Sequence, residues 1–225
     1  SKNSGKFAGY GPWANCYAGH QFGSWAGQLG DGRAITLLEA ATPFSAAEEN
    51  AYGGGVLPMP PRTEVQLKGA GRTPYSRFAD GLATLASSVR EYLCSEAMAA
   101  LNIPTSRALA VLAVRDVTVV RERASVAAVT ARLAPSWLRI GSFQIHASRG
   151  EWESVRILGE YVARDLLAIE GVGKSHDDVE EDRKVLRKPW ALALAKEVAR
   201  RNAETIARWQ VNGFMHGGEQ ARPSS

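Results

Sequence analysis

The sequence has no long apolar run and almost no cysteine, and both absences exclude classes of protein. The longest unbroken apolar run, Ala108–Val114, has seven residues, whereas a helix that crosses a membrane needs about 20. The two cysteines, Cys16 and Cys94, support neither a disulfide framework nor a metal-ligand spacing, and this favours a reducing compartment. The chain begins Ser-Lys-Asn without a starting methionine or a targeting pattern, which leaves its localisation open.

A large excess of one charge is also missing. The chain has 27 basic and 23 acidic residues, a net charge of +4. Surfaces that bind nucleic acid are usually far more basic, so this balance favours a local anion site over a nucleic-acid surface. Hydrophobic residues make up 45% and charged residues 22% of the chain, which is typical of an ordinary globular protein. Its 225 residues suffice for one core or for two small lobes.

The N-terminal part combines glycine-rich segments with strand patterns. Residues 1–31 are dense in glycine and aromatic residues, and such glycines let a ligand approach the main chain closely. Strands are predicted over Gly32–Glu39 and over Glu64–Lys68, which alternates polar and apolar residues. Between them, Ala40–Arg62 has no periodicity and is rich in glycine and proline, so we expect residues 40–62 to form a mobile surface insert.

The best helix signal of the first half covers Ser88–Leu101. Ser88 and Glu91 fit a capping box, in which the serine caps the first turn and the glutamate bonds back to it. Pro104 stops the helix shortly after its last residues. This pattern predicts that Glu91 lies in the first turn of the helix.

Three β-rich runs follow, and the short connections between them favour an antiparallel meander. The runs are Ala108–Val114, Val117–Arg121 and Val126–Leu133. From Trp152 the pattern becomes helical, with helices predicted over Val155–Ile169 and over Pro189–Val211. The charged stretch between them, Lys174–Lys188, is interpreted as a solvated linker.

The order of these elements predicts an α+β fold. A glycine-rich strand pair, a strand ending in lysine, a helix with a glutamate, antiparallel strands and then helices is the order in a protein-kinase-like chain. We therefore place an antiparallel β small lobe with a central helix at residues 1–150 and the start of a helical large lobe at 151–217. We expect residues 218–225 to form a polar tail, which the family comparison below marks as divergent.

Lys68 and Glu91 are the first candidate pair. Kinases hold a phosphate-binding lysine in place by pairing a strand lysine with a glutamate on the next helix. The alternative is that Lys68 is a surface lysine and Glu91 only a capping carboxylate. These two residues alone leave both interpretations open.

The segment Gly30–Arg33 and two later arginines are further candidates. Successive glycine amides can form a concave anion site, to which Arg33 adds a planar fork for phosphate oxygens. Arg132 lies in an otherwise apolar strand, which is unusual unless it points into a polar cavity, and Arg139 can converge on the same anion after the bend at Pro135. The alternatives are a tight hairpin with a solvated Arg33, and one surface salt bridge for each later arginine.

Two other patterns are set aside. Gly171–Ser175 resembles the end of a P-loop, but Ala168 stands where the first glycine belongs and the segment follows a helix. The histidines are too scattered to form a metal-ligand set; they are His20, His146, His176 and His216.

The longer segments of the sequence carry a family resemblance. They are Tyr17–Gly23, Gly30–Ala34, Gln66–Arg77, Asp80–Gly81, Ser87–Met98, Ile103–Leu109, Arg132–Ser136 and Trp209–Gly217. Together they resemble the selenoprotein O family, which is related to the protein kinases. The resemblance extends from about Tyr10 to Gly217.

This resemblance implies a kinase-like fold that binds ATP in a flipped orientation and transfers AMP to hydroxyl side chains of other proteins. It implies that Lys68, with its helix partner Glu91, grips the phosphates of ATP, and that Arg132 and Arg139 hold phosphates as well. It implies further ATP contacts from the glycine loop, at Gly30, Gly32 and Arg33, and from Asp80 and Gly81. It also implies a mitochondrial location in a eukaryote and a cytoplasmic one otherwise. No nucleic acid or membrane partner is expected.

Two departures from the family pattern change what we expect. The connection Ala40–Arg62 is much longer than usual and resembles an insertion. After His216-Gly217 the family continues with an Asn-Thr-Asp-Asn catalytic loop and a metal-binding aspartate, whereas this chain continues as Gly218–Ser225. We therefore expect the catalytic base and the Mg²⁺ ligands to be absent and the chain to be inactive alone. A non-catalytic ATP-binding or protein-interaction fragment is the alternative, and the paired arginines argue against ordinary phosphoryl transfer.

Overall fold

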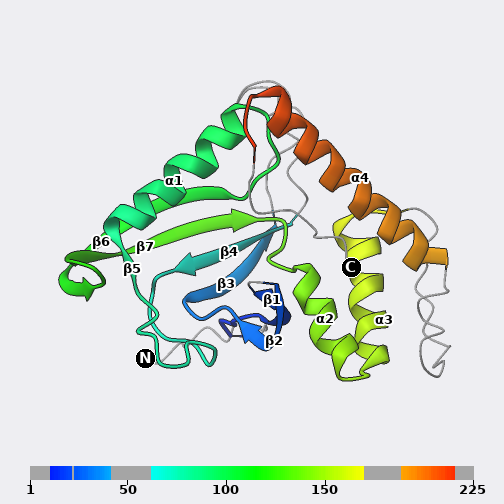
Figure 1. The fold of residues 1–225 in the computed structure, drawn as a ribbon, viewed down its shortest axis with the longest axis horizontal. Helices are drawn as coiled ribbons and strands as arrows, with labels where there is room; N and C mark the ends of the chain where they lie inside the picture. Colours follow the sequence, from blue (N-terminus) through cyan, green and yellow to red (C-terminus); the bar gives the residue numbers. More distant parts are fainter. Residues whose placement is uncertain (1–10, 22, 42–61, 170–188, 216–225) are drawn as a thin grey trace, which may run out of the picture.

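The computed structural model describes residues 11–21, 23–41, 62–169 and 189–215 (Figure 1). Within these residues the chain forms antiparallel sheets and helices, so the predicted α+β class is confirmed. A two-stranded sheet pairs β1 (Cys16–Gln21) with β2 (Ser24–Gly30). The larger sheet has the order β3 (Ala34–Ala41), β4 (Arg62–Lys68), β7 (Ala124–Ala134) and β5 (Ala83–Thr84), and β6 (Arg107–Val120) also pairs with β7.

The ends of the expected insert belong to the larger sheet. Ala40 pairs with Thr63 and Ala41 with Arg62, so the β3–β4 ladder runs beyond the strand limits that the sequence predicted. Backbone pairing in an antiparallel ladder does not require alternating polar and apolar side chains. A prediction from side-chain periodicity therefore ended these strands too early. The rest of the expected insert, residues 42–61, lies outside the described residues.

The predicted meander of three strands is wrong, because the first two runs form one strand. β6 is 14 residues long and pairs with β7 in a hairpin that projects to the left in Figure 1. Arg115 and Asp116, the short connection between the first two predicted runs, lie inside β6 where its register with β7 shifts between Val114 and Thr118. Such an irregularity takes up extra residues without ending the strand.

Helix α1 (Leu85–Ala100) starts three residues before the predicted helix. Thr84 is the N-cap, and its hydroxyl accepts a hydrogen bond from the backbone amide of Ser87 at 3.3 Å. The predicted capping box is therefore wrong: Ser88 is buried and its hydroxyl has no hydrogen-bond partner. The earlier start places Glu91 about two turns into the helix, where its carboxylate is free to reach the sheet that α1 covers through β6 and β7.

The C-terminal part contains a helix that the sequence did not predict, α2 (Ile140–Ser148). It is followed by α3 (Trp152–Tyr161), which continues into the π-helical turn η2 (Val162–Leu166) and replaces the single helix predicted over Val155–Ile169. The predicted helix Pro189–Val211 is confirmed as α4. In the described part of the chain, no helix is both long and apolar enough to cross a membrane.

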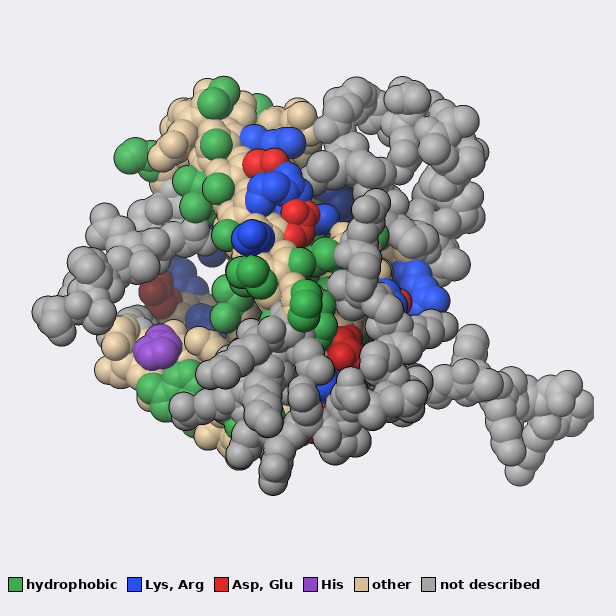
Figure 2. All heavy atoms as spheres, turned by 90° about the vertical axis from the view of Figure 1, so that its right-hand side faces the viewer, with side chains coloured by type: hydrophobic (Ala, Val, Ile, Leu, Met, Phe, Trp, Pro, Cys, Tyr) green, Lys and Arg blue, Asp and Glu red, His purple; other side chains and the backbone are tan. Residues whose placement is uncertain are grey.

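Two glycines allow the helices to pack closely. A Cβ on Gly141 of α2 would come within 2.2 Å of the carbonyl oxygen of Ala18, so α2 lies directly against β1. A Cβ on Gly159 of α3 would come within 2.4 Å of the Trp190 ring of α4. The face shown in Figure 2 carries basic and acidic side chains next to one another, in keeping with the ion pairs of Arg200 on α4.

The middle of the larger sheet buries polar side chains among small apolar ones. Gln66 on β4 and Thr36 on β3 are fully buried, and the Gln66 amide donates a hydrogen bond to the Thr36 hydroxyl at 3.2 Å. Alanines such as Ala128 fill the space around the centre of β7. A buried amide needs a partner for its donor and for its acceptor atoms. The NH₂ group of Gln66 bonds to Thr36, so its carbonyl oxygen needs a hydrogen-bond donor from the neighbouring site.

The capping assignment predicts opposite outcomes for two neighbouring substitutions. Thr84→Ala removes the cap of α1 and should lower the free energy of unfolding by about 1 kcal/mol. Ser88→Ala removes a buried hydroxyl that has no partner, so it should change stability by less than about 0.5 kcal/mol. Urea denaturation of both variants measures the difference. A larger loss of stability in Ser88→Ala than in Thr84→Ala would support Ser88 as the cap.

Candidate functional site

One cleft of about 830 Å³ brings together most of the predicted site residues. Its lining includes Gly32, Arg33, Lys68, Asp80, Gly81, Arg132 and Arg139. Gly30 lies instead in an adjoining hollow of about 360 Å³, and Glu91 contacts two of the cleft's cations. These seven predicted residues therefore lie together, although they come from five separate places in the chain.

Glu91 connects a strand lysine to a strand arginine. Its Oε2 atom lies 2.8 Å from the Lys68 ammonium and its Oε1 atom 2.8 Å from the Arg132 guanidinium. The predicted pairing of Lys68 with Glu91 is thus confirmed, and the second partner was not foreseen. Burial opposes the charge of Glu91, but the hydrogen bonds and charges of Lys68 and Arg132 outweigh it and hold the pKa of the carboxyl below its usual value.

Arg132 is held from several sides. One terminal nitrogen donates to Glu91, the other to the side-chain carbonyl of Gln66, and the guanidinium lies 4.3 Å from the centre of the Trp137 ring. Its side chain is 13% exposed, and burial lowers the pKa of Arg132 although the charge of Glu91 opposes the shift. An arginine remains charged under such a shift, so Arg132 presents a fixed cation to the cleft.

Arg139 reaches the same cleft from the residue that precedes α2. Its guanidinium lies 3.3 Å from the Asp31 carboxylate and 4.3 Å from the centre of the Tyr17 ring. The two arginines therefore converge, as expected, but each is also paired with an acid inside the site. Burial raises the pKa of the Tyr17 hydroxyl, with Arg139 acting in the opposite direction, so Tyr17 contributes a neutral ring.

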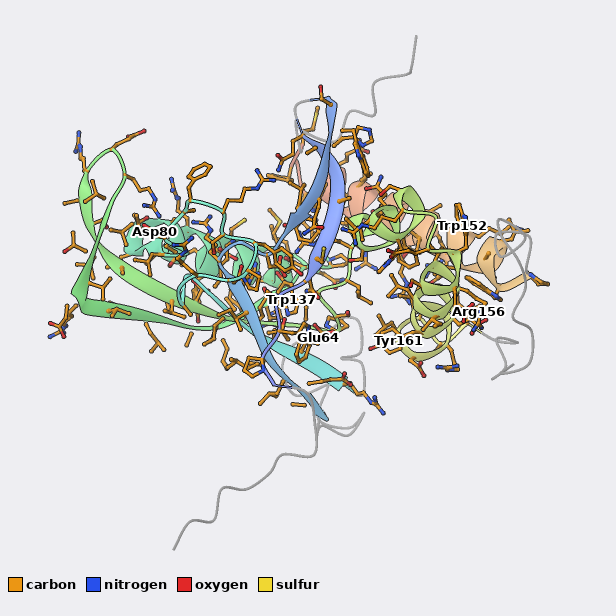
Figure 3. The ribbon with its side chains drawn as sticks, turned by 90° about the horizontal axis from the view of Figure 1, so that it is seen from below. Glu64, Asp80, Trp137, Trp152, Arg156 and Tyr161 are labelled. Carbon is orange, nitrogen blue, oxygen red and sulfur yellow. The ribbon has the colours of Figure 1, made fainter. Side chains whose placement is uncertain are left out.

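Asp80 and Arg121 form the other end of the cleft. Two nitrogens of Arg121 lie 2.7 and 2.8 Å from the Asp80 carboxylate, and these bonds, with one from the Leu82 amide, lower the pKa of Asp80 to about 2. Figure 3 shows Asp80 toward the free end of the β6–β7 hairpin and Trp137 near the middle of the molecule. Arg121 was not singled out in the sequence, because nothing there indicated that the end of β6 returns to this loop.

The loop 72–80 fixes the glycine turn Gly30–Arg33. The Thr73 hydroxyl donates to the carbonyl of Asp31 at 2.7 Å, and the Ser76 hydroxyl donates to the carbonyl of Gly32 at 2.5 Å. A Cβ on Gly30 would come within 2.3 Å of the Tyr75 ring, so this position requires glycine for packing. Gly81 is required too, because its φ is +73° and a Cβ there would lie 2.1 Å from the carbonyl oxygen of Gly71.

The cleft is electropositive and has no cluster of acidic ligands. Its lining has two carboxylates, Asp31 and Asp80, and five cations, Arg33, Lys68, Arg121, Arg132 and Arg139. Across residues 11–21, 23–41, 62–169 and 189–215, no group of three or more His, Cys, Asp or Glu residues is placed to hold a metal ion. The excess of cations over carboxylates therefore fits a polyanion. The Gly171–Ser175 segment and His216 lie outside the described residues.

Comparison with known proteins decides the family. The family model described as protein adenylyltransferase SelO matches residues 1–218 of the chain. This chain belongs to the SelO family. Its relatives include the mitochondrial protein adenylyltransferase SelO of Schizosaccharomyces pombe, which is 46% identical over 206 residues, or 92% of this chain and 32% of the relative.

Bacterial relatives are equally similar to this SelO-family chain. The protein nucleotidyltransferase YdiU of Bordetella avium is 48% identical over 205 residues, which are 91% of this chain and 36% of the relative. YdiU of Cupriavidus pinatubonensis is 44% identical over 207 residues, 92% of this chain and 34% of the relative. The chain thus spans about a third of the length of the curated relatives it matches.

The double pairing of Glu91 predicts a pH-dependent loss of stability. The pKa of Glu91 in the folded protein lies below its ordinary value of 4.5, so its stabilising effect is complete above that value. The effect is lost as the pH falls through the folded pKa. Glu91→Gln should lower the free energy of unfolding by about 1–3 kcal/mol at pH 7 and should flatten the loss of stability below pH 4.5.

The control for this prediction is Glu204→Gln on the exposed surface of α4. Glu204 pairs with Arg200 there, and an exposed pair of this kind should change stability by less than about 0.5 kcal/mol. Urea midpoints at pH 7 and at pH 3.5 measure both variants. Equal losses for the two variants would contradict a special role for the Glu91 pairs.

Proposed function

We propose that this chain is the ATP-binding part of a protein adenylyltransferase. The observation that carries the proposal is the cationic cleft in which Glu91 holds Lys68 and Arg132 side by side. A triphosphate needs several cations in fixed positions, and ordered cations act without reorganising when the ligand arrives. The lysine of β4 paired with a glutamate of α1 is also the arrangement of a kinase small lobe, which supports the kinase-like part of the proposal.

The residues of the cleft suit the binding of phosphates by different means. Lys68 supplies a compact ammonium charge, whereas Arg132 and Arg139 supply planar forks for pairs of phosphate oxygens. The tight turn at Gly30–Arg33 brings backbone close to the ligand and adds the side chain of Arg33. We propose that these groups, together with Asp80 and Gly81 at the far end, bind ATP in the flipped orientation that the family resemblance implies.

In AMP transfer, a hydroxyl oxygen of the acceptor protein attacks the α-phosphorus and the bond to pyrophosphate breaks. The hydroxyl proton leaves with a base, and negative charge accumulates on the departing pyrophosphate. Cations in fixed positions, such as Lys68 and Arg132, stabilise that charge. The names of the relatives, protein adenylyltransferase and protein nucleotidyltransferase, support proteins as acceptors, and the family resemblance implies that the acceptor groups are hydroxyl side chains. Mg²⁺ would offset further phosphate charge when bound, but no step here depends on it.

A second candidate function is ATP binding without catalysis by the chain alone. Each carboxylate described in or beside the cleft is in an ion pair: Asp31 with Arg139, Asp80 with Arg121, and Glu91 with Lys68 and Arg132. A carboxylate held by a cation is a weak base at neutral pH. We therefore propose that these 225 residues bind ATP and that AMP transfer belongs to the whole protein.

ATP binding should depend on the cleft's cations. Lys68→Ala should weaken ATP affinity at least about tenfold, because a hydrogen bond to a charged group is worth about 1.5–3 kcal/mol. Arg115→Ala, at an exposed position on β6 away from the cleft, should leave affinity unchanged. Isothermal titration calorimetry with ATP, combined with thermal melting to check folding, measures both. Equal affinity of the two variants for ATP would contradict the assignment of this cleft as the ATP site.

Transfer activity tests the second candidate function. The chain incubated with α-labelled ATP, with casein as a general hydroxyl acceptor and with either Mg²⁺ or Mn²⁺, should incorporate no label into itself or into casein. The physical reason is that every described acid of the cleft is already paired with a cation. Robust incorporation that is lost in Lys68→Ala would show that the chain contains a complete catalytic centre.

A further inference from the structure

Asp31 is an acid in a site that otherwise attracts anions, and the mechanism above gives it no role. Its side chain is only 5% exposed, and its position between Gly30 and Gly32 places it in the turn that lines the cleft. A buried negative charge beside a phosphate site opposes binding unless a neighbouring cation offsets it. The contacts of Asp31 therefore decide whether it hinders the ligand or organises the site.

The carboxylate of Asp31 is fixed from its own side of the cleft. Its Oδ2 atom accepts hydrogen bonds from the backbone amide of Asn15 at 3.3 Å and from the Asn15 side chain at 3.1 Å. The backbone of Asp31 is held as well, since its amide donates to Asn15 at 2.9 Å and its carbonyl accepts from Thr73 at 2.7 Å. Asp31 therefore cannot turn away from the cleft without breaking several bonds.

The other oxygen of Asp31 makes only one contact with Arg139. A single terminal nitrogen of Arg139 lies 3.3 Å from Oδ1, whereas a bidentate pair would use two nitrogens. The guanidinium is stacked on the Tyr17 ring at 4.3 Å, and the side chain of Arg139 remains 43% exposed. Asp31 and Tyr17 thus fix where the guanidinium lies while most of its N–H groups stay available to a ligand.

We infer that Asp31 is a positioning residue: together with the Tyr17 ring it holds the Arg139 guanidinium in the orientation that binds the phosphates of the nucleotide. This inference rests on the proposed ATP-binding function. The contribution of Asp31 exceeds its electrostatic repulsion of the phosphates, because the guanidinium is ordered before the ligand arrives and loses less freedom on binding. Asp31 acts only through Arg139, which makes the effects of the two residues non-additive.

The test is a double-mutant cycle on ATP affinity in the full chain. Asp31→Asn keeps the size of the side chain and its acceptor for Asn15 but removes the charge that holds Arg139. We expect Asp31→Asn and Arg139→Ala each to weaken ATP binding about tenfold, and the double variant to bind no more weakly than Arg139→Ala alone. Additive losses would show that Asp31 acts independently of Arg139, and tighter binding by Asp31→Asn would show that it competes with the phosphates; either result overturns the inference.

The Tyr17 ring provides a second pair of variants that does not depend on the folding of Asp31→Asn. Tyr17→Phe keeps the stacking surface and should bind ATP as the wild type does. Tyr17→Leu removes the aromatic face and should weaken binding about fivefold, since a partly exposed cation–π contact is worth about 1 kcal/mol. Equal affinities of Tyr17→Leu and Tyr17→Phe would contradict the proposed support of Arg139.

A readout without nucleotide separates this inference from the proposed function. In the free protein, the ¹⁵N–¹H side-chain signal of Arg139, assigned from its loss in Arg139→Ala, should be shifted by the Tyr17 ring and should report an ordered group. In Asp31→Asn that signal should move to the position typical of a solvated arginine. If the wild type does not bind ATP, the proposed ATP-binding function is wrong. If the Arg139 signal is unchanged in Asp31→Asn, only the positioning role of Asp31 is wrong.

Discussion

The structure depends on one carboxylate that lies between two cations. Glu91 belongs to α1, Lys68 to β4 and Arg132 to β7, so the two ion pairs connect the helix to two neighbouring strands of the larger sheet. Removing such charges from water has a cost that only close pairing offsets, which fixes the distance of α1 from the sheet. The same two ion pairs therefore fix both the packing of the helix and the positions of the two cations in the cleft.

The same logic extends through the rest of the cleft. Each acid that faces it contacts at least one arginine or lysine, yet the cations remain in excess and partly open to solvent. The acids of the cleft therefore hold its cations in place. A site built in this way is ready for a polyanion before the polyanion arrives, in keeping with the family's chemistry of nucleotide transfer.

The sequence predicted what local patterns encode and missed what only the folded chain brings together. Lys68 ends an alternating strand and Glu91 follows on the next helix, so their pairing could be foreseen. The cap at Thr84 could not, because Ser88-Val-Arg-Glu91 fits the capping-box pattern, whereas Thr84 has a serine and no glutamate three residues later. Arg121 and Gln66 were missed for another reason: their partners, Asp80 and Arg132, lie 41 and 66 residues away. Helix α2 has little helical periodicity of its own and forms against β1, where Gly141 permits contact.

The buried amide of Gln66 has a consequence for how this family can change over time. Its two ends bond to Thr36 on one neighbouring strand and to Arg132 on the other, and the side chains of Gln66 and Thr36 are fully buried. A hydrophobic residue at position 66 would remove one hydrogen-bond partner from Thr36 and one from Arg132, and a glutamate would place a second carboxylate beside the arginine. Positions 36, 66 and 132 should therefore evolve as one unit, retained or replaced together, while the exposed positions around the cleft's rim diverge freely.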